Sequence, residues 1–292
     1  MTLTTAVPAP PAPPARPKVA KLGRPNFFVY ATLAVFVLGS LFPFYWSFLV
    51  ASRDNGMLTE RVPPLVPGGN FFANAAQVFD SVAFWKAMGN SVLVATSVTL
   101  STVLFSSLAG FAFAKLRFRG RDPLFVFIVV TLAVPTQLGV IPLFIAMSEL
   151  GWAGGLQAVI VPNLVTAFGV FWMRQYTVDA VPHELIEAAR VDGCSMIRTF
   201  WHVCLPAVRP AAAVLAMFTF MTSWNDFLWP LIVLDAGNPT VQLALEQLQS
   251  GYYTNYSLVL AGTTLATIPI LIVFLLLGRQ IVAGIMQGAV KG

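Results

Sequence analysis

Six stretches of this 292-residue chain are almost free of charged side chains, and each is long enough to cross a lipid bilayer. A membrane-spanning helix needs roughly 20 apolar residues, and backbone groups in lipid must be satisfied within their own segment, which favours helices. Only 10% of the residues are charged, whereas a soluble domain carries about 25%. The sequence therefore predicts an all-α, polytopic membrane protein with six transmembrane helices. The predicted spans are 27–51, 87–114, 123–148, 156–173, 211–234 and 258–278.

The distribution of Lys and Arg predicts the orientation, because loops on the cytoplasmic side of a membrane are enriched in these residues. Of the 17 Lys and Arg residues, only Arg53, Arg61 and Lys86 fall on one side of the six predicted spans. The others lie in both terminal tails and in the loops after the second and fourth spans. Both termini are therefore expected to be cytoplasmic. The net charge of +5 reflects this orientation, and no nucleic-acid partner is expected.

The first 25 residues differ in composition from the rest of the chain. They form a run rich in Ala and Pro that cannot pack a core, so 1–25 is predicted to be a disordered cytoplasmic tail. The first apolar run is longer than the roughly 7–15 residues of a signal-peptide core, so no cleaved signal peptide is expected. The remainder, 26–292, is predicted to be one transmembrane domain.

The predicted spans contain few groups that could drive transport or catalysis. No Gly-Lys dipeptide occurs, which excludes a phosphate-binding P-loop, and no enzymatic site is expected. Asp226 is the one acidic residue within a span, and counting about 1.5 Å per residue from Val208 places it near the outer face. This scarcity disfavours an ion-coupled secondary transporter, which stays as an alternative beside a membrane scaffold or receptor. The spacing of Cys194, His202 and Cys204 fits no common zinc site, so no metal is expected.

A polar segment at about 179–206, between the fourth and fifth spans, is predicted to be a cytoplasmic loop of two short helices. Pro182 fits a helix start, where its missing N–H costs nothing. Asp192 and Gly193 should end this first helix, because Gly tolerates a left-handed cap. Ser195 is placed to cap a second helix that leads back to the membrane.

The first of these helices has the features of a lever that docks on another protein. Ala188 and Ala189 are small enough for two backbones to approach closely, Glu187 and Asp192 offer polar groups that fix a register, and Gly193 permits a sharp bend. These residues are equally compatible with an ordinary surface loop made of good helix formers. The residues alone leave both interpretations open.

The spacing of this loop resembles that of a known family. Glu-Ala-Ala at 187–189 is followed after three residues by Gly193, and after nine more by Val203 and then Leu-Pro at 205–206. This pattern resembles the EAA loop of inner-membrane permease subunits of binding-protein-dependent ABC importers. Val203 stands where that family usually has Ile, and the other fixed positions match.

Two further segments are similar to one branch of that family. Ser-Trp-Asn-Asp-Phe-Leu-Trp-Pro at 223–230 resembles the fifth-span segment of carbohydrate-uptake permeases, and Gly-Ala-Val-Lys-Gly at 288–292 is similar to their C-terminus. The strongest resemblance is to the six-span subunit of maltose-type sugar permeases. The resemblance covers the spans and leaves out the Pro-rich tail.

The resemblance implies a type I ABC importer permease in a bacterial inner membrane, forming half of a path for a sugar or oligosaccharide. A second permease chain would form the other half, and the resemblance favours a heterodimer. Two ATP-binding subunits would dock on the cytoplasmic side and use the ATP, so this chain needs no cofactor. A solute-binding protein would deliver substrate from outside. The residues implied in docking are Glu187, Ala188, Ala189, Asp192 and Gly193.

A group of polar and aromatic residues near the end of the fifth span is the candidate substrate path. Asn225 and Asp226 can form hydrogen bonds with sugar hydroxyls, and Trp224 and Trp229 can stack on sugar rings. The alternative is an aromatic belt at the outer membrane interface, where Trp is common.

Small residues and prolines give two further expectations about the spans. Ser106, Gly110 and Ala114 recur at a four-residue spacing, which lets helix backbones approach closely in lipid. Pro135 and Pro142 should fall on one face of the third span and bend or loosen it.

Overall fold

The computed structural model describes residues 26–60, 64–250 and 253–289. The predicted tail at 1–25 and the last three residues of the C-terminal motif lie outside these ranges. The described residues are helical, with no named strand among them and one isolated bridge between Gly154 and Leu234. The chain divides into two compact units after Pro43. Helix α1 (Phe27–Ala51) runs across that boundary, and the side chains of its first part are almost all exposed.

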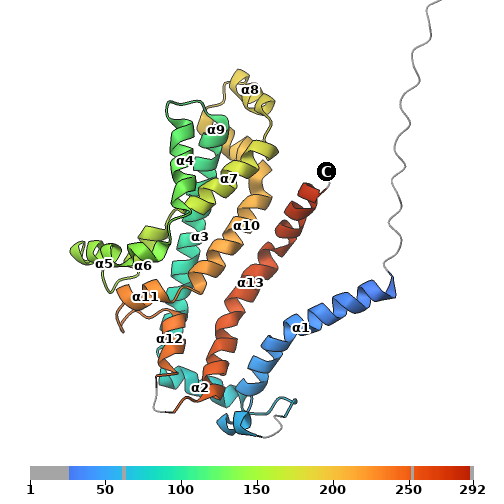
Figure 1. Ribbon diagram of the computed structural model, residues 1–292, viewed down its shortest axis with the longest axis vertical. Helices are drawn as coiled ribbons and strands as arrows, with labels where there is room; N and C mark the ends of the chain where they lie inside the picture. The colour runs from blue at the N-terminus through green and yellow to red at the C-terminus, as the bar shows by residue number, and fades with distance from the viewer. Residues whose placement is uncertain (1–25, 61–63, 251–252, 290–292) are drawn as a thin grey trace, which may run out of the picture. The chain divides into compact units, whose positions relative to one another are not determined.

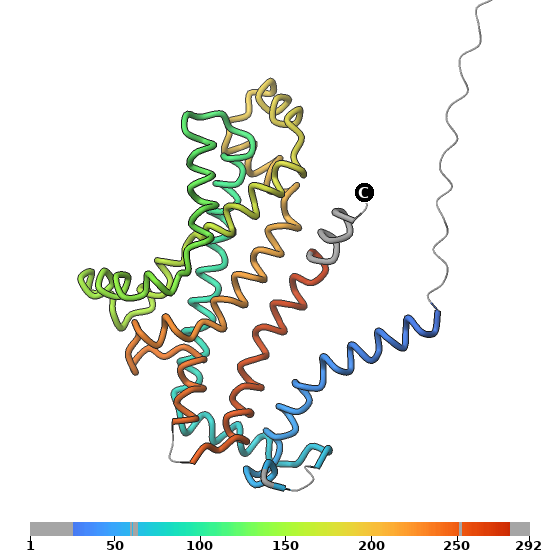
Figure 2. The backbone as a smooth tube through the Cα atoms, in the orientation of Figure 1, coloured from blue at the N-terminus to red at the C-terminus, as the bar shows by residue number. Residues whose placement is uncertain are grey.

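The larger unit is built on four long helices, α3 (Phe84–Lys115), α7 (Ala167–Ala180), α10 (Leu205–Trp224) and α13 (Tyr256–Ala289). Helix α3 packs against α7 and α10, and α10 also packs against α13 (Figures 1 and 2). Their side chains are mostly apolar all round, as expected of helices that face either lipid or one another.

Four helices are long and apolar enough to cross a membrane: Phe27–Ala51, Phe84–Lys115, Met196–Trp224 and Tyr256–Gln280. They confirm the first, second and sixth predicted spans, whereas the helix at the fifth starts earlier than predicted and ends at Trp224 instead of reaching 234. The third and fourth predicted spans are present as apolar segments, but neither is a continuous helix.

The third predicted span is a bent pair of helices. Helix α4 (Arg121–Thr131) and the segment formed by η2 (Thr136–Gly139) and α5 (Val140–Glu149) meet at 92°. Pro135 lies in the break, and Pro142 lies in the first turn of α5. The expectation that both prolines share one face of a single helix is therefore wrong. Pro135 has no N–H to donate, so the helix ends before it and a new one starts after it.

The fourth predicted span is also interrupted. Short helices α6 (Gln157–Ile160) and η3 (Val161–Asn163) precede α7. Thr166 has an extended backbone, and its hydroxyl accepts a 3.0 Å hydrogen bond from the Gly169 N–H, which caps α7. Hydropathy alone does not reveal this break, because the interrupting segment is only a few residues long and mostly apolar.

Helices α3 and α7 approach closely at small residues, as the four-residue spacing predicted. A Cβ added at Gly110 would lie 2.8 Å from the backbone N of Arg174 and 2.8 Å from the backbone carbon of Met173. A Cβ added at Gly169 would lie 2.4 Å from the Ser106 hydroxyl oxygen. These contacts place the α7 backbone directly against α3.

The two ends of this unit carry different elements (Figure 1). At one end, η1 (Asn55–Thr59), α2 (Phe71–Ser81) and α12 (Val241–Gln247) lie near the start of α13. At the other end lie α8 (His183–Val191) and α9 (Met196–Thr199). Helix α11 (Leu228–Val233) follows α10 and packs against α5 and α6.

Candidate functional sites

Helix α8 has the ends that the sequence predicted. Pro182 immediately precedes its first residue, and Glu184 lies in its first turn. At its other end the Cys194 N–H donates to the Ala189 carbonyl at 2.9 Å, and the Gly193 N–H donates to the Arg190 carbonyl at 3.0 Å. This pair of bonds is a Schellman motif, and it requires the positive φ of 75° that Gly193 adopts.

The second predicted helix starts as expected, but it continues into the fifth span instead of ending before it. The Ser195 hydroxyl accepts a 3.3 Å hydrogen bond from the Arg198 N–H and so caps α9. Helix α9 then continues through a π-helical turn, Phe200–Cys204, into α10. The result is one uninterrupted run, Met196–Trp224, rather than a separate short helix.

One face of α8 is anchored to the helix bundle. Ile186 is buried in a cluster with Phe111, Val181 and Phe200, among others, and Ala189 is buried as well. Ala189 therefore faces the bundle of this chain. The other predicted docking residues are exposed: Glu187, Ala188, Asp192 and Gly193.

The opposite face of this region presents apolar side chains to the surroundings. The exposed fraction is 88% for Val191, 70% for Ile197 and 48% for Leu185. Trp201 is 47% exposed, whereas the neighbouring Phe200 is buried in the bundle. Exposed apolar side chains gathered on a polar loop are typical of a protein-protein contact.

Charged residues surround a cavity beside α8. It has a volume of about 580 Å³, and Lys115, Arg117, Glu187 and Arg190 contribute to its lining. Lys115 reaches across to α7, where its ammonium group donates to the Val178 carbonyl at 3.3 Å. The cavity thus lies between the end of α3 and the predicted docking helix, α8.

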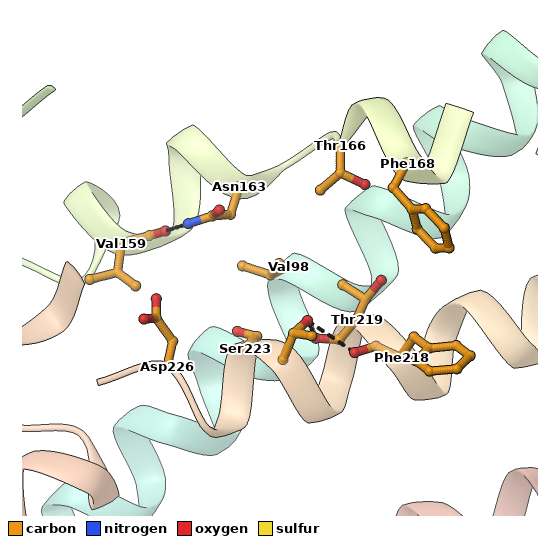
Figure 3. Close-up of a pocket in the computed structure, with 10 residues that line it drawn as sticks. Val98, Val159, Asn163, Thr166, Phe168, Phe218, Thr219, Ser223 and Asp226 are labelled. Atoms are coloured by element: carbon orange, nitrogen blue, oxygen red, sulfur yellow. Dashed lines mark hydrogen bonds between the residues drawn. The ribbon is translucent and has the colours of Figure 1, made fainter. Parts of the chain in front are cut away.

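A second cavity, of about 460 Å³, lies between α3, the interrupted fourth segment and α10 (Figure 3). Its walls combine neutral polar groups, apolar side chains and one carboxylate. The lining residues are Val98, Val159, Asn163, Thr166, Phe168, Phe218, Thr219, Thr222, Ser223 and Asp226.

The cavity reaches toward the middle of the membrane-spanning bundle. Val98 lies about 21 Å along α3 from Phe84, at 1.5 Å per residue, and α3 is about 48 Å long. Asp226 lines this same cavity, just past the end of α10. Helix α10 ends at Trp224, and the chain then turns toward α6 instead of continuing straight outward.

The four predicted substrate-path residues have different surroundings. Trp224 and Trp229 are buried, and their indole N–H groups donate to the carbonyls of Ala266 at 3.2 Å and Ala158 at 3.0 Å. Neither ring face is open to a sugar in this conformation. The Asn225 amide donates to the Met221 carbonyl at 2.9 Å. Of the four predicted residues, Asp226 is the one that lines the cavity.

Sequence reasoning missed most of the cavity-lining residues. The open aromatic rings at the cavity belong to Phe168 and Phe218, which are 45% and 56% exposed. Asn163 and Thr166 lie at the break before α7. In the sequence, Asn163 and Thr166 could have been noticed as two polar residues shortly after Pro162 in an otherwise apolar stretch.

Cys194 and Cys204 are both free thiols, and Cys204 is buried. Within the described ranges no group of three or more His, Cys, Asp and Glu side chains is arranged to hold a metal ion. Both thiols are replaced in the labelling experiments below, so that an introduced cysteine is the one thiol of the chain.

Comparison with known proteins places the chain in a family. Residues 102–287 match the family described as binding-protein-dependent transport system inner membrane component. The chain is 35% identical over 268 residues to the lactose transport system permease protein LacG of Rhizobium radiobacter, covering 91% of this chain and 97% of that protein. It is 37% identical over 210 residues to the arabinooligosaccharides transport system permease protein AraQ of Halalkalibacterium halodurans, covering 72% and 75%. It is 30% identical over 271 residues to the sn-glycerol-3-phosphate transport system permease protein UgpE of Yersinia pestis, covering 90% and 96%.

The fold matches solved structures as well. A chain from a bacterial ABC transporter that imports the acidic polysaccharide alginate superposes with a TM-score of 0.73 at 24% identity, covering 86% of this chain and 95% of that one. A bacterial alginate ABC transporter in complex with a periplasmic protein bound to an alginate pentasaccharide gives 0.62 at 14% identity, covering 87% and 93%. The chain therefore belongs to the family of inner-membrane permease components of binding-protein-dependent transport systems.

Proposed function

We propose that this chain is the permease subunit of an ATP-driven importer of a sugar or oligosaccharide. Relatives are named for the transport of lactose, arabinooligosaccharides and diacetylchitobiose, which supports a carbohydrate substrate. The chain itself would hydrolyse no ATP and would form half of the translocation path. Both termini would lie in the cytoplasm.

The observation that carries this proposal is the mechanical continuity between α8 and the membrane cavity. Helix α8 is joined through the Gly193 turn to the run Met196–Trp224. That run also supplies Phe218, Thr219, Thr222 and Ser223 to the cavity wall. A partner that moves α8 would therefore move one wall of the cavity, because α8 leads directly into this helical rod.

The exposed surface of α8 supports a docking role. Glu187 and Ala188 are exposed beside the apolar side chains of Leu185, Val191 and Ile197. An ATP-binding subunit would cover this surface, one copy on this chain and one on a second permease chain, most simply a different polypeptide. A solute-binding protein would dock at the opposite end, near α2 and α12.

Site-specific crosslinking tests this arrangement. In a background of Cys194→Ser and Cys204→Ala, the Ala188→Cys variant should crosslink to an ATP-binding subunit in native membranes. The matched control is Gly69→Cys, because Gly69 has open space around it and belongs to the loop before α2. The proposal is wrong if the thiol introduced at position 188 forms no such crosslink in membranes where the assembled transporter is active. It is equally wrong if the thiol introduced at position 69 forms the crosslink as well as the one at 188.

A further inference from the structure

Beyond the general sugar specificity proposed above, on which this inference rests, we infer that the 460 Å³ cavity selects against anionic sugars and that Asp226 is the selectivity-determining residue. The cavity would accept neutral sugar units and units that carry an amine. Carboxylated or phosphorylated units would be disfavoured.

The lining has the chemistry of a carbohydrate site. Its volume falls in the range of about 300–1,000 Å³ typical of small-molecule sites. Two exposed aromatic rings, Phe168 and Phe218, offer flat apolar faces to the apolar faces of a sugar ring. Neutral groups that can exchange hydrogen bonds with hydroxyls surround them: Asn163, Thr166, Thr219, Thr222 and Ser223.

Asp226 is the one ionisable group among the ten lining residues, and no Lys or Arg contributes to the wall. In the described part of the chain its carboxylate has no ion-pair partner within 4.0 Å, since the one salt bridge there joins Arg121 to Asp122. Figure 3 shows Asp226 and Val159 on facing segments at one end of the group of lining residues, with the Asp226 carboxylate pointing toward Val159. An unpaired carboxylate at membrane depth is costly, which points to a function.

A structural role for Asp226 has to be separated from an electrostatic one. The Asp226 carboxylate lies just before α11, close to the backbone N–H of Trp229. Asp226→Asn keeps the size of the side chain and one oxygen that can accept a hydrogen bond, and it removes the charge. It is therefore the variant that isolates the proposed effect.

The charge can be measured without knowing the natural substrate. A single cysteine is introduced by Thr222→Cys in a background of Cys194→Ser and Cys204→Ala, and the full transporter is kept in native membranes. The Thr222 hydroxyl bonds to the carbonyls of Phe218 and Thr219 in its own helix, so its loss breaks no hydrogen bond to another element. The rates of reaction with a cationic and an anionic methanethiosulfonate reagent of similar size are then compared.

A unit charge at about 6 Å in water changes the local concentration of each reagent by about threefold, in opposite directions. The cationic-to-anionic rate ratio for the Thr222→Cys thiol should therefore fall by about tenfold when Asp226→Asn is added. For the Gly69→Cys control, the same change should leave the ratio unaltered. An unchanged ratio at position 222, or an introduced thiol there that reacts with neither reagent, would overturn the inference.

Sugar protection tests the selectivity directly. Lactose should slow the labelling of the Thr222→Cys thiol more than lactobionate, its carboxylated counterpart, and Asp226→Asn should reduce this difference. Equal protection by both compounds, or by neither, would contradict the assignment. Failure of the proposed function would appear separately, as a transporter in which the Ala188→Cys variant forms no crosslink to an ATP-binding subunit.

Discussion

At the residue scale, Gly193 shows how one backbone conformation shapes the docking region. Its φ of 75° closes the Schellman motif at the end of α8, and no heavy atom lies within 4 Å of the place where a Cβ would stand. Space is therefore not the constraint at this position. The constraint is conformational, because residues other than Gly pay about 1–2 kcal/mol in the left-handed region.

Replacing Gly193 with Val should uncouple α8 from the rest of the chain. A β-branched residue disfavours the left-handed conformation most strongly, so the turn would open and transport should fall by about tenfold or more, in line with a cost of about 1.4 kcal/mol per tenfold. The measurement is ATP-dependent uptake at equal membrane levels of the protein. Gly193→Asn is the matched control, since Asn enters this region more easily and should retain most activity. Full activity of the Val variant would rule out a role for the turn.

At the element scale, two contacts hold α7 and α8 to the rest of the bundle. Helices α3 and α7 touch at Gly110, which lies against the backbone of Met173 and Arg174. Helix α8 is held to the bundle through Ile186 and Ala189, while its outer face stays open. The first contact is a rigid one between backbones, and the second is an anchor for a surface helix.

Gly110→Ala should destabilise the packing of α3 on α7. The new Cβ would meet backbone atoms of Met173 and Arg174 at 2.8 Å, and backbone cannot move aside as a flexible side chain can. Overpacking of this kind costs about 1–3 kcal/mol, so the thermal midpoint in detergent should fall by several degrees. Gly89→Ala, on the same helix with nothing within 4 Å, should leave the midpoint unchanged or raise it. Equal midpoints for the two variants would show that the close approach contributes nothing to stability.

Ile186→Ala should release α8 from the bundle. Truncating a buried Ile costs about 2–5 kcal/mol, and here the loss falls on one short helix. Hydrogen exchange of the α8 amides should accelerate markedly. Leu185→Ala, at the exposed neighbouring position, should leave exchange unchanged while weakening the capture of the ATP-binding subunit. If both variants exchange like the original protein, the anchoring role of Ile186 is wrong.

At the scale of the whole molecule, the proposed docking helix and the proposed substrate cavity lie apart. Helix α8 lies at one end of the larger unit, and the cavity lies between α3 and α10 toward its middle (Figures 1 and 3). Within the described residues, Asp226 is the one carboxylate that lines this cavity. A relay of titratable groups, which an ion-coupled carrier would use, is not formed by the lining residues.

Uptake by the reconstituted transporter should therefore depend on ATP and survive the loss of ion gradients. Vesicles that contain the full complex, its solute-binding protein and internal ATP should accumulate substrate in the presence of protonophore and sodium ionophore. Removing ATP should abolish accumulation. Uptake that collapses with the ionophores and persists without ATP would favour the ion-coupled alternative.

The sequence predicted the features that depend on neighbours along the chain. Helix α8 begins after Pro182 and ends at the Gly193 turn as expected, because caps and left-handed turns are decided by a few consecutive residues. Single-helix spans 27–51 and 258–278 were likewise recognisable from apolar composition and length. The resemblance to the family was recognised from the spacing of residues in the loop, and this spacing is a property of the local sequence alone.

Features that depend on contacts between distant segments were decided only by the tertiary structure. The sequence could not show that Ala189 faces the bundle, that Trp224 and Trp229 are buried, or that Asp226 lines a cavity with Asn163. Each of these depends on where α10 ends and on how α6 and α7 pack beside it. Apolar composition specifies that a segment avoids water, but lipid and protein interior satisfy that requirement equally well. Only packing between helices distinguishes the two.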